Sequence, residues 1–195
     1  MTQVTTEATT QLWKTHSYYE VFQARFNAVE CQQIIDLHGK SHLVHSTMSN
    51  GAGLSLRESD LFWIPRTTDT EWIFARLWNL VTLYNSKYGF ELSDELGQAQ
   101  LTRYRPGQHY EWHMYLGPAQ MSLRKLTVVV ELVAKDLMKG GGLEIFYGDA
   151  MENKVHVDIG DVVVFPSFVM HRALVIEGGT RWSFVLWLNG TRPLQ

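Results

Sequence analysis

The sequence predicts an α+β domain, with helices in the N-terminal half and a β-sandwich or barrel after about residue 99. Two observations predict this class. Before that point, apolar residues recur at the spacings of three and four that are typical of amphipathic helices. After it, short β-rich runs follow one another, separated by turns that contain glycine or proline.

Two helices are expected in the N-terminal half. Asn27 and Glu30 match a capping box, which predicts a helix through residues 31–40 that Gly39 would end. The apolar spacing predicts a second helix over about 70–88. Between them, LRESDLFWI is typical of a strand.

The second half is expected to be built from strands. β-branched and aromatic residues cluster in short runs, and the turns between them supply the reversals that a sandwich or barrel needs. The expected strands are 98–106, 126–134, 143–148, 154–160, 161–167, 173–178 and 181–190.

Composition is that of one soluble globular domain. The chain has 195 residues, 45% of them hydrophobic and 19% charged, which excludes disordered, collagen-like and coiled-coil proteins. A formal net charge of −3 gives no electrostatic reason to expect nucleic acid or a membrane as partner. We expect a disordered threonine-rich tail over 1–15 and a single domain over 16–195. The oligomeric state is not specified by the sequence.

Cysteine usage and the chain start indicate a compartment. Cys31 is the single cysteine, so an internal disulfide and a cysteine-based zinc site are excluded and a reducing environment is expected. The segment MTQVTTEATT lacks the apolar core of a signal peptide, and no apolar window is long enough to span a membrane. We therefore expect a cytoplasmic protein.

Histidine and acidic residues gather in the segment YRPGQHYEWHMYLG. In an extended chain His109, Glu111, His113 and Tyr115 would share one face, because side chains alternate along a strand. Ordinary polar strand residues are the alternative interpretation. For five other histidines we expect no chemical role: His16, His38, His42, His45 and His156, the last of which should face solvent.

A second cluster lies near the C-terminus. His171 ends an apolar run, and Arg181 and Ser183 lie two residues apart in the final apolar strand, facing the same way. A buried arginine without a partner is costly, so Arg181 requires an anion. A protein carboxylate and a ligand carboxylate would both satisfy it.

Four segments together resemble a known family. YRPGQHYEWHMYLG, RKLTVVVELV, GGGLEIF and GDVVVFPSFVMHRALVIEGGTRWSFVLWLNG occur in the order and spacing of the Fe(II)- and 2-oxoglutarate-dependent oxygenases, prolyl 4-hydroxylase-like branch. The resemblance covers about residues 20–190. It implies a double-stranded β-helix, or jelly roll, with the N-terminal helices packed on one sheet and iron near the open end. Fe(II) and 2-oxoglutarate are the implied cofactor and cosubstrate, with ascorbate helping to keep the iron reduced.

The resemblance also implies roles for individual residues. Two neutral imidazoles and one further ligand on one face of Fe(II) leave positions open for a 2-oxo acid and dioxygen. The metal ligands would be His113 and His171, and the 2-oxoglutarate pocket would be formed by Arg181, Ser183, Tyr104 and Trp187.

The chain departs from the family at the third metal ligand. The family has His-x-Asp, whereas this chain has His113-Met114-Tyr115. Four alternatives follow. Tyr115 would bind the metal as a phenolate, or it would point elsewhere and leave the position to water or halide. Alternatively, Glu111 would supply the third ligand, or the site would no longer bind catalytic iron. The sequence does not distinguish a natural tyrosine from an engineered one. Tyrosine is not small, so we rank hydroxylation above halogenation.

Glu131 is the second unusual residue, because it interrupts an apolar strand. We expect it to face outward or to pair with Arg124 or Lys125; a role in shaping the substrate is the alternative. The Gly- and Ser-rich segments 46–59 and 117–122 are expected to shape the substrate entrance.

The resemblance implies a dioxygenase that hydroxylates an amino-acid or prolyl-type substrate. The alternatives are a catalytically impaired or non-catalytic protein that binds 2-oxoglutarate or metal on the same fold, and an oxygenase with a different outcome.

Overall fold

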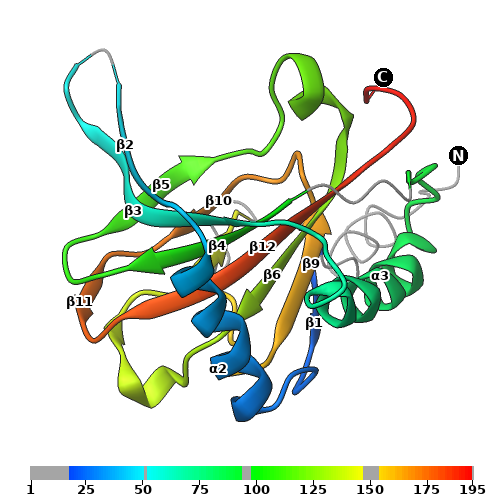
Figure 1. Cartoon of the computed structure of the whole chain (residues 1–195). Helices are drawn as coiled ribbons and strands as arrows, with labels where there is room; N and C mark the ends of the chain where they lie inside the picture. Colours follow the sequence, from blue (N-terminus) through cyan, green and yellow to red (C-terminus); the bar gives the residue numbers. More distant parts are fainter. Residues whose placement is uncertain (1–17, 51, 94–97, 147–153, 195) are drawn as a thin grey trace, which may run out of the picture.

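The computed structural model describes residues 18–50, 52–93, 98–146 and 154–194, so the expected tail over 1–15 lies outside the described residues. Its main element is one antiparallel sheet of ten strands that curls into a half-barrel (Figure 1). Among the described residues, a two-stranded sheet and two α-helices accompany it. No helix in the described part of the chain is both long and apolar enough to cross a membrane. The observed fold confirms the predicted jelly roll with N-terminal helices.

The elements have the following bounds. The large sheet contains β1 (Glu20–Phe22), β2 (Leu43–Ser49), β3 (Ser55–Ile64), β4 (Ala99–Tyr104), β5 (His109–His113), β6 (Arg124–Glu131), β8 (Leu143–Ile145), β9 (Val162–Pro166), β10 (His171–Ala173) and β12 (Arg181–Asn189). The small sheet pairs β7 (Lys139–Gly140) with β11 (Ile176–Gly178). The helices are α2 (Ala28–Asp36) and α3 (Glu71–Asn85), with short 3₁₀ turns at Leu37–Lys40, Ala119–Leu123 and Lys135–Leu137.

Strand β3 joins the two halves of the sheet. The strand order is β1-β9-β6-β12-β4-β3-β5-β10-β8, with β2 on the other edge of β3. One end of β3 pairs with β4 over Asp60–Ile64, and the other end pairs with β5 at Arg57 and Glu58. The sheet therefore bends at β3, and β5 and β10 lie across one cavity from β12, which carries Arg181 and Ser183.

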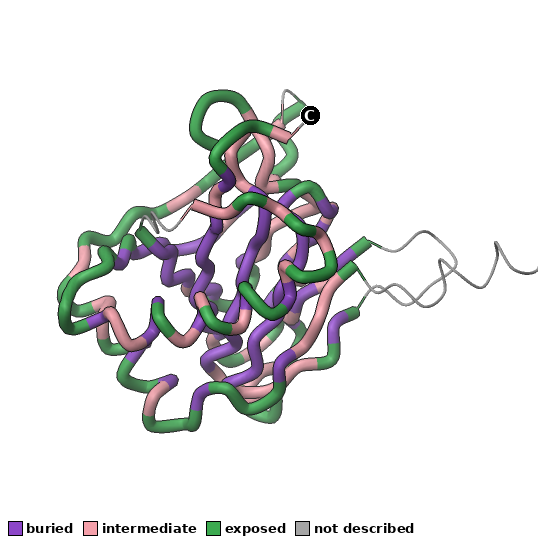
Figure 2. The backbone as a smooth tube through the Cα atoms, turned by 90° about the vertical axis from the view of Figure 1, so that its right-hand side faces the viewer, coloured by how far each residue is buried: buried purple, intermediate pink, exposed green. Residues whose placement is uncertain are grey.

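The central strands are buried on both faces, as Figure 2 shows by their colour. Val128 and Val130 of β6 pack in the core beneath α2 and α3, whereas Val129 between them packs in the barrel interior. The same alternation holds along β9 and β12. Burial on both faces explains why these strands read as continuous apolar runs.

The N-terminal predictions are confirmed in type and corrected in extent. The capping box of Asn27 and Glu30 is present, but α2 ends at Asp36 and a 3₁₀ turn continues past Gly39. Helix α3 begins after Thr70 as predicted and ends at Asn85, a few residues early.

Three strand predictions need correction. Much of the segment 46–59, expected as an entrance loop, is the β2–β3 hairpin. Residues 154–160 form no strand and make one bridge, Lys154 with Glu144. His156 is exposed as expected. Strand β1 was not predicted, because it is three residues long and its partner β9 is remote in sequence.

A tight backbone contact fixes the end of β6. The carbonyl of Gly160 accepts hydrogen bonds from the backbone N–H groups of Arg25 and Phe26, and its own N–H donates to the carbonyl of Glu131 at 2.8 Å. Gly160 has φ +80°, and a Cβ there would lie 1.8 Å from the Phe26 carbonyl oxygen. This contact holds Glu131 in place at the strand end.

We predict that Gly160→Ala destabilises the fold much more than Gly53→Ala. Both glycines have a positive φ, at +80° and +78°, so both variants carry the left-handed penalty of about 1 kcal/mol. Gly53 has open space around its Cβ position, whereas Gly160 does not. The backbone clash should add about 2 kcal/mol or more to the loss of unfolding free energy in urea. Equal losses for the two variants would contradict this account.

Candidate functional site

The strand register brings two histidines together in the barrel interior. His113 at the end of β5 lies opposite His171 at the start of β10, and their ring centroids are 4.1 Å apart. Each Nδ1 donates to a backbone carbonyl, that of Glu111 at 2.7 Å and that of Val169 at 2.9 Å. The proton therefore lies on Nδ1, and the lone pair lies on Nε2. Both Nε2 atoms are buried and have no hydrogen-bond partner among the described residues.

Burial keeps both imidazoles neutral. It lowers the pKa of His171 to about 4. Burial, followed by the neighbouring His171, lowers the pKa of His113 to about 2. Neutral imidazoles with a fixed tautomer and two free Nε2 atoms are the form that binds a metal ion.

A β-bulge in β5 changes which residues share a face. His171 pairs with His113, but Ala173 pairs with Tyr110, so β5 has one extra residue between the two pairs. Tyr110 consequently stacks on His113, with centroids 3.4 Å apart and planes 10° from parallel. The predicted simple alternation is therefore wrong.

Glu111 does not join the histidine pair. Its carboxylate lies 3.8 Å from the guanidinium of Arg172, which also bonds Glu144 and lies over the ring of Trp112. Within the described ranges, no group of three His, Cys, Asp or Glu side chains is placed to hold a metal ion. The alternative in which Glu111 replaces the aspartate is therefore wrong.

Tyr115 stands directly beside the histidine pair. Its ring centroid lies 5.0 Å from that of His113 and 4.6 Å from that of His171, and it also contacts Trp187. Its backbone N–H donates to the carbonyl of Ser167 at 3.0 Å, which fixes the chain after β5. Burial raises the pKa of Tyr115 well above its ordinary value, so the phenol is protonated without a metal. Tyr115 thus lies next to both histidines, and its place as the third ligand stays a prediction.

Arg181 is paired within the protein. Its Nε donates to Glu131 Oε2 at 3.0 Å and a terminal nitrogen donates to Oε1, so the two groups form a bidentate ion pair. Both residues are 3% exposed. Burial alone would lower the pKa of Arg181, but the Glu131 carboxylate outweighs burial and raises it.

The prediction for Glu131 is therefore wrong. In the β6–β12 register Glu131 lies opposite Ser183, on the same interior face as Val129, so Arg181 is its diagonal neighbour. Arg124, one of the expected partners, instead lies over Trp187, 4.1 Å from the ring centroid. The two anions expected as alternatives for Arg181 were a protein carboxylate and a ligand carboxylate. The structure pairs it with the protein carboxylate of Glu131.

The cavity between the histidines and Arg181 is small. Its volume is about 20 Å³, enough for about one water molecule. Tyr104 and Ser183 line it as predicted, whereas Trp187 packs against Tyr115 and is not among the lining residues. The lining consists of Tyr104, Tyr110, His113, Tyr115, Val129, Leu143, His171, Ala173, Arg181, Ser183 and Val185.

Arg57 is a residue that sequence reasoning missed. It is 7% exposed, its Nε donates to Ser59 Oγ at 2.9 Å, and its guanidinium lies 4.5 Å from the ring centroid of Tyr110. One terminal nitrogen has no partner in the described part of the chain. In the sequence, Arg57 and Ser59 lie two residues apart on an expected strand, so they should share one face. The sequence did not show that this face is buried.

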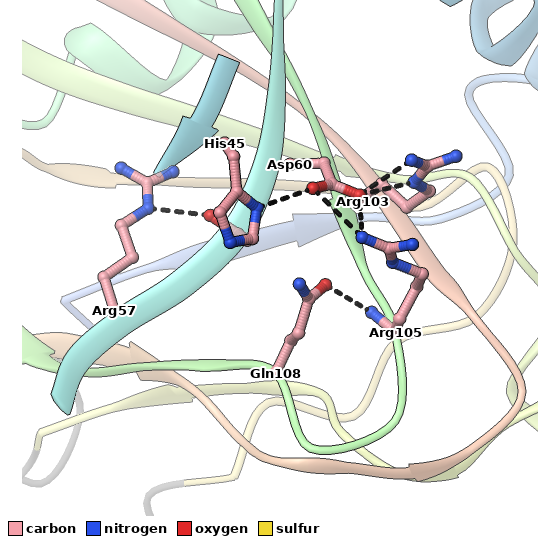
Figure 3. Close-up of polar contacts among 7 residues, drawn as sticks. His45, Arg57, Asp60, Arg103, Arg105 and Gln108 are labelled. Atoms are coloured by element: carbon pink, nitrogen blue, oxygen red, sulfur yellow. Dashed lines mark hydrogen bonds and ion pairs between the residues drawn. The ribbon is translucent and has the colours of Figure 1, made fainter. Parts of the chain in front are cut away.

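Asp60, next along β3, belongs to a separate charge cluster shown in Figure 3. It bonds His45 of β2 and Arg103 of β4, and Arg105 approaches it at 3.0 Å. Burial alone would raise the pKa of Asp60, but hydrogen bonds from His45 and Arg103 lower it. This cluster ties β2, β3 and β4 together.

The turn between β4 and β5 is fixed by Gln108. Its Oε1 accepts from the backbone N–H of Arg105 at 2.8 Å (Figure 3). The backbone N–H groups of Gly107 and Ile176 tie the turn to β11. The turn sets the start of β5 and hence the position of His113.

Comparison with known proteins agrees with this arrangement. Residues 99–189 match the family model of the 2OG-Fe(II) oxygenase superfamily. A PKHD-type hydroxylase from Synechococcus sp. (strain CC9605) is 26% identical over 100 residues, which is 51% of this chain and 45% of the relative. The match thus spans less than half of that relative's length.

Solved structures share the fold. A Pseudomonas putida prolyl-4-hydroxylase superposes with a TM-score of 0.70 at 20% identity, covering 95% of this chain and 98% of the other. A viral collagen prolyl hydroxylase from Paramecium Bursaria Chlorella virus-1, in complex with 2OG, gives 0.66 at 19% identity, covering 90% and 97%.

The superfamily implies Fe(II) and 2-oxoglutarate, and the described residues fit the two unequally. The buried, unpartnered Nε2 atoms of His113 and His171 fit a metal ion. The cosubstrate pocket does not fit 2-oxoglutarate as it stands, because Arg181 is already paired with Glu131 and the cavity is about 20 Å³.

We predict that the metal-free protein loses stability in mild acid through the histidine pair. Their folded pKa values lie below the unfolded value of about 6.5, so the unfolded chain binds more protons below that pH. This contribution is complete above pH 6.5 and is lost as the pH falls toward 4. Between pH 7 and 5 the wild type should lose about 3 kcal/mol more unfolding free energy than the His113→Gln/His171→Gln variant. Urea unfolding in chelator measures it, and parallel pH profiles would contradict it.

Proposed function

We propose that the chain is an Fe(II)- and 2-oxoglutarate-dependent dioxygenase that hydroxylates an amino-acid or prolyl-type substrate. The observation that carries the proposal is the pair of buried imidazoles, each with its Nδ1 bonded to a carbonyl and its Nε2 free. When bound, iron and 2-oxoglutarate supply the oxidation of a substrate C–H bond by dioxygen.

The protein's own residues hold and enclose the site. His113 and His171 would bind the metal, and Tyr115, whose ring packs against both, would stand at the position of the third ligand. Phe165 and Trp187 pack around them and keep water out. The similar proteins, a PKHD-type hydroxylase and two prolyl hydroxylases, support an amino-acid or prolyl-type substrate, either small or within a peptide.

We predict that His113→Ala and His171→Ala each abolish stoichiometric Mn(II) binding and Fe(II)-dependent succinate formation. Each variant removes one of two ligands that lie at strand ends, so the β-core should remain folded by circular dichroism. His156→Ala, which changes an exposed histidine, is the matched control and should keep both properties. Metal affinity unchanged in both site variants would refute the metal assignment.

A non-catalytic protein on the same fold is the second candidate. The Arg181–Glu131 pair and Tyr115 favour it, because they occupy the cosubstrate anchor and the third ligand position. Purified protein with Fe(II), ascorbate and 2-oxoglutarate separates the candidates. Succinate above a metal-free control supports the dioxygenase, and metal binding without succinate supports the second candidate.

We predict that Tyr115→Asp tightens Fe(II) binding by about tenfold, because a short carboxylate is ionised at pH 7 and a buried phenol is not. Succinate formation should rise in parallel. Tyr115→Ala, which opens the same space without supplying a ligand, is the control. An alanine variant that gains as much as the aspartate variant would show that space, and not ligand chemistry, limits the site.

A further inference from the structure

We propose that Glu131 occupies the carboxylate anchor of the 2-oxo acid pocket and thereby sets its selectivity: 2-oxoglutarate binds only by displacing Glu131 from Arg181. The inference rests on the proposed function, since it concerns the cosubstrate of that site. It makes Glu131 a specificity-determining residue.

The geometry of the ion pair carries the first step. Arg181 presents Nε and a terminal nitrogen as a planar fork, and both donate to the two oxygens of Glu131. A ligand carboxylate bound to an arginine uses the same fork. The edge of Arg181 that would hold the distal carboxylate of 2-oxoglutarate is therefore already bonded to a carboxylate of the protein.

The charge balance gives the second step. Arg181 and Glu131 are both 3% exposed and together carry no net charge. A further carboxylate placed against Arg181 would meet the Glu131 carboxylate at short range in a dry interior, where repulsion is strong. Arg57, the other buried guanidinium here, is held against Tyr110 and Ser59 and does not line the cavity, although one of its terminal nitrogens has no partner among the described residues. The intact pair therefore opposes an acid with a charged distal end.

A larger cavity beside Glu131 could accept its displaced side chain. Glu131, which bonds Arg181, also lines a cavity of about 630 Å³. Lys135, Lys139 and Lys154 line the same cavity, together with three successive glycines. Asp158 and Asp161 also line it, and their carboxylates accept hydrogen bonds from backbone N–H groups. Rotation of the Glu131 side chain toward these lysines would free the arginine fork.

Cavity size acts separately from charge. The small cavity must widen for any 2-oxo acid, and Tyr115 lines it. That cost is shared by acids of equal length, whether or not they carry a distal carboxylate. The difference in affinity between two such acids therefore reports on the charges around the pocket, and the change in that difference when Glu131 is substituted reports on Glu131.

The experiment compares two acids on the full-length protein loaded with Mn(II). 2-Oxoglutarate and 2-oxopentanoate have the same chain length, but only the first has a distal carboxylate. Calorimetric titration of the wild type should give affinities within about threefold of each other. Glu131→Gln should tighten 2-oxoglutarate by about tenfold or more and leave 2-oxopentanoate within about twofold.

A matched control uses another bidentate pair. Glu30 of α2 holds Arg76 in the same way, remote from the pocket, so Glu30→Gln should leave both affinities unchanged. Because Glu131→Gln leaves a buried charge, a second variant guards against unfolding. Glu131→Gln/Arg181→Gln has a neutral pair of similar shape and should bind the two acids equally.

The following results would overturn the proposal. One is a wild type that prefers 2-oxoglutarate by about a hundredfold with Glu131 intact. Others are a folded Glu131→Gln protein that gains no affinity for 2-oxoglutarate, or a double variant that still prefers it. These titrations do not depend on turnover: succinate formation with no effect at Glu131 would refute the inference alone, and a gain at Glu131 without succinate would refute the dioxygenase alone.

Discussion

A guanidinium buried in a β-barrel must have an anion beside it, and here Glu131 provides that anion. The pair depends on the register between β6 and β12, which sets Glu131 opposite Ser183 and diagonal to Arg181. It also depends on the Gly160 contact that ends β6. Because both charges are satisfied internally, the fold is complete without a bound acid. The same interaction that closes the barrel therefore controls access to its anchor.

The metal half of the site follows a different principle. His113 and His171 are oriented by backbone carbonyls and left with nothing on Nε2, so their unsatisfied lone pairs favour a metal ion. Arg181 has its partner and the histidines do not. The two Nε2 atoms are thus free for a metal ion, whereas the arginine that would hold the cosubstrate is already paired. Tyr115 lines the cavity that both groups border.

Much of the fold, and part of the candidate site, could be predicted from the sequence. Turn punctuation and apolar periodicity predicted the helices, most strands and a sandwich or barrel. The family resemblance implied the jelly roll and pointed to His113, His171 and Arg181. The partner of Arg181 could not be predicted, because it depends on a register between strands fifty residues apart. Glu111 was misplaced because a one-residue bulge in β5 is not encoded by an obvious glycine. Arg57 was missed because a strand's pattern does not show which face becomes the barrel interior.

The most direct test of the central claim is a crystal structure of the Mn(II)-loaded protein soaked with 2-oxoglutarate. The account predicts metal bound to Nε2 of His113 and His171, the distal carboxylate bidentate on Arg181, and the Glu131 side chain turned away from it. A complex in which 2-oxoglutarate occupies the cavity while Glu131 keeps both bonds to Arg181 would contradict it.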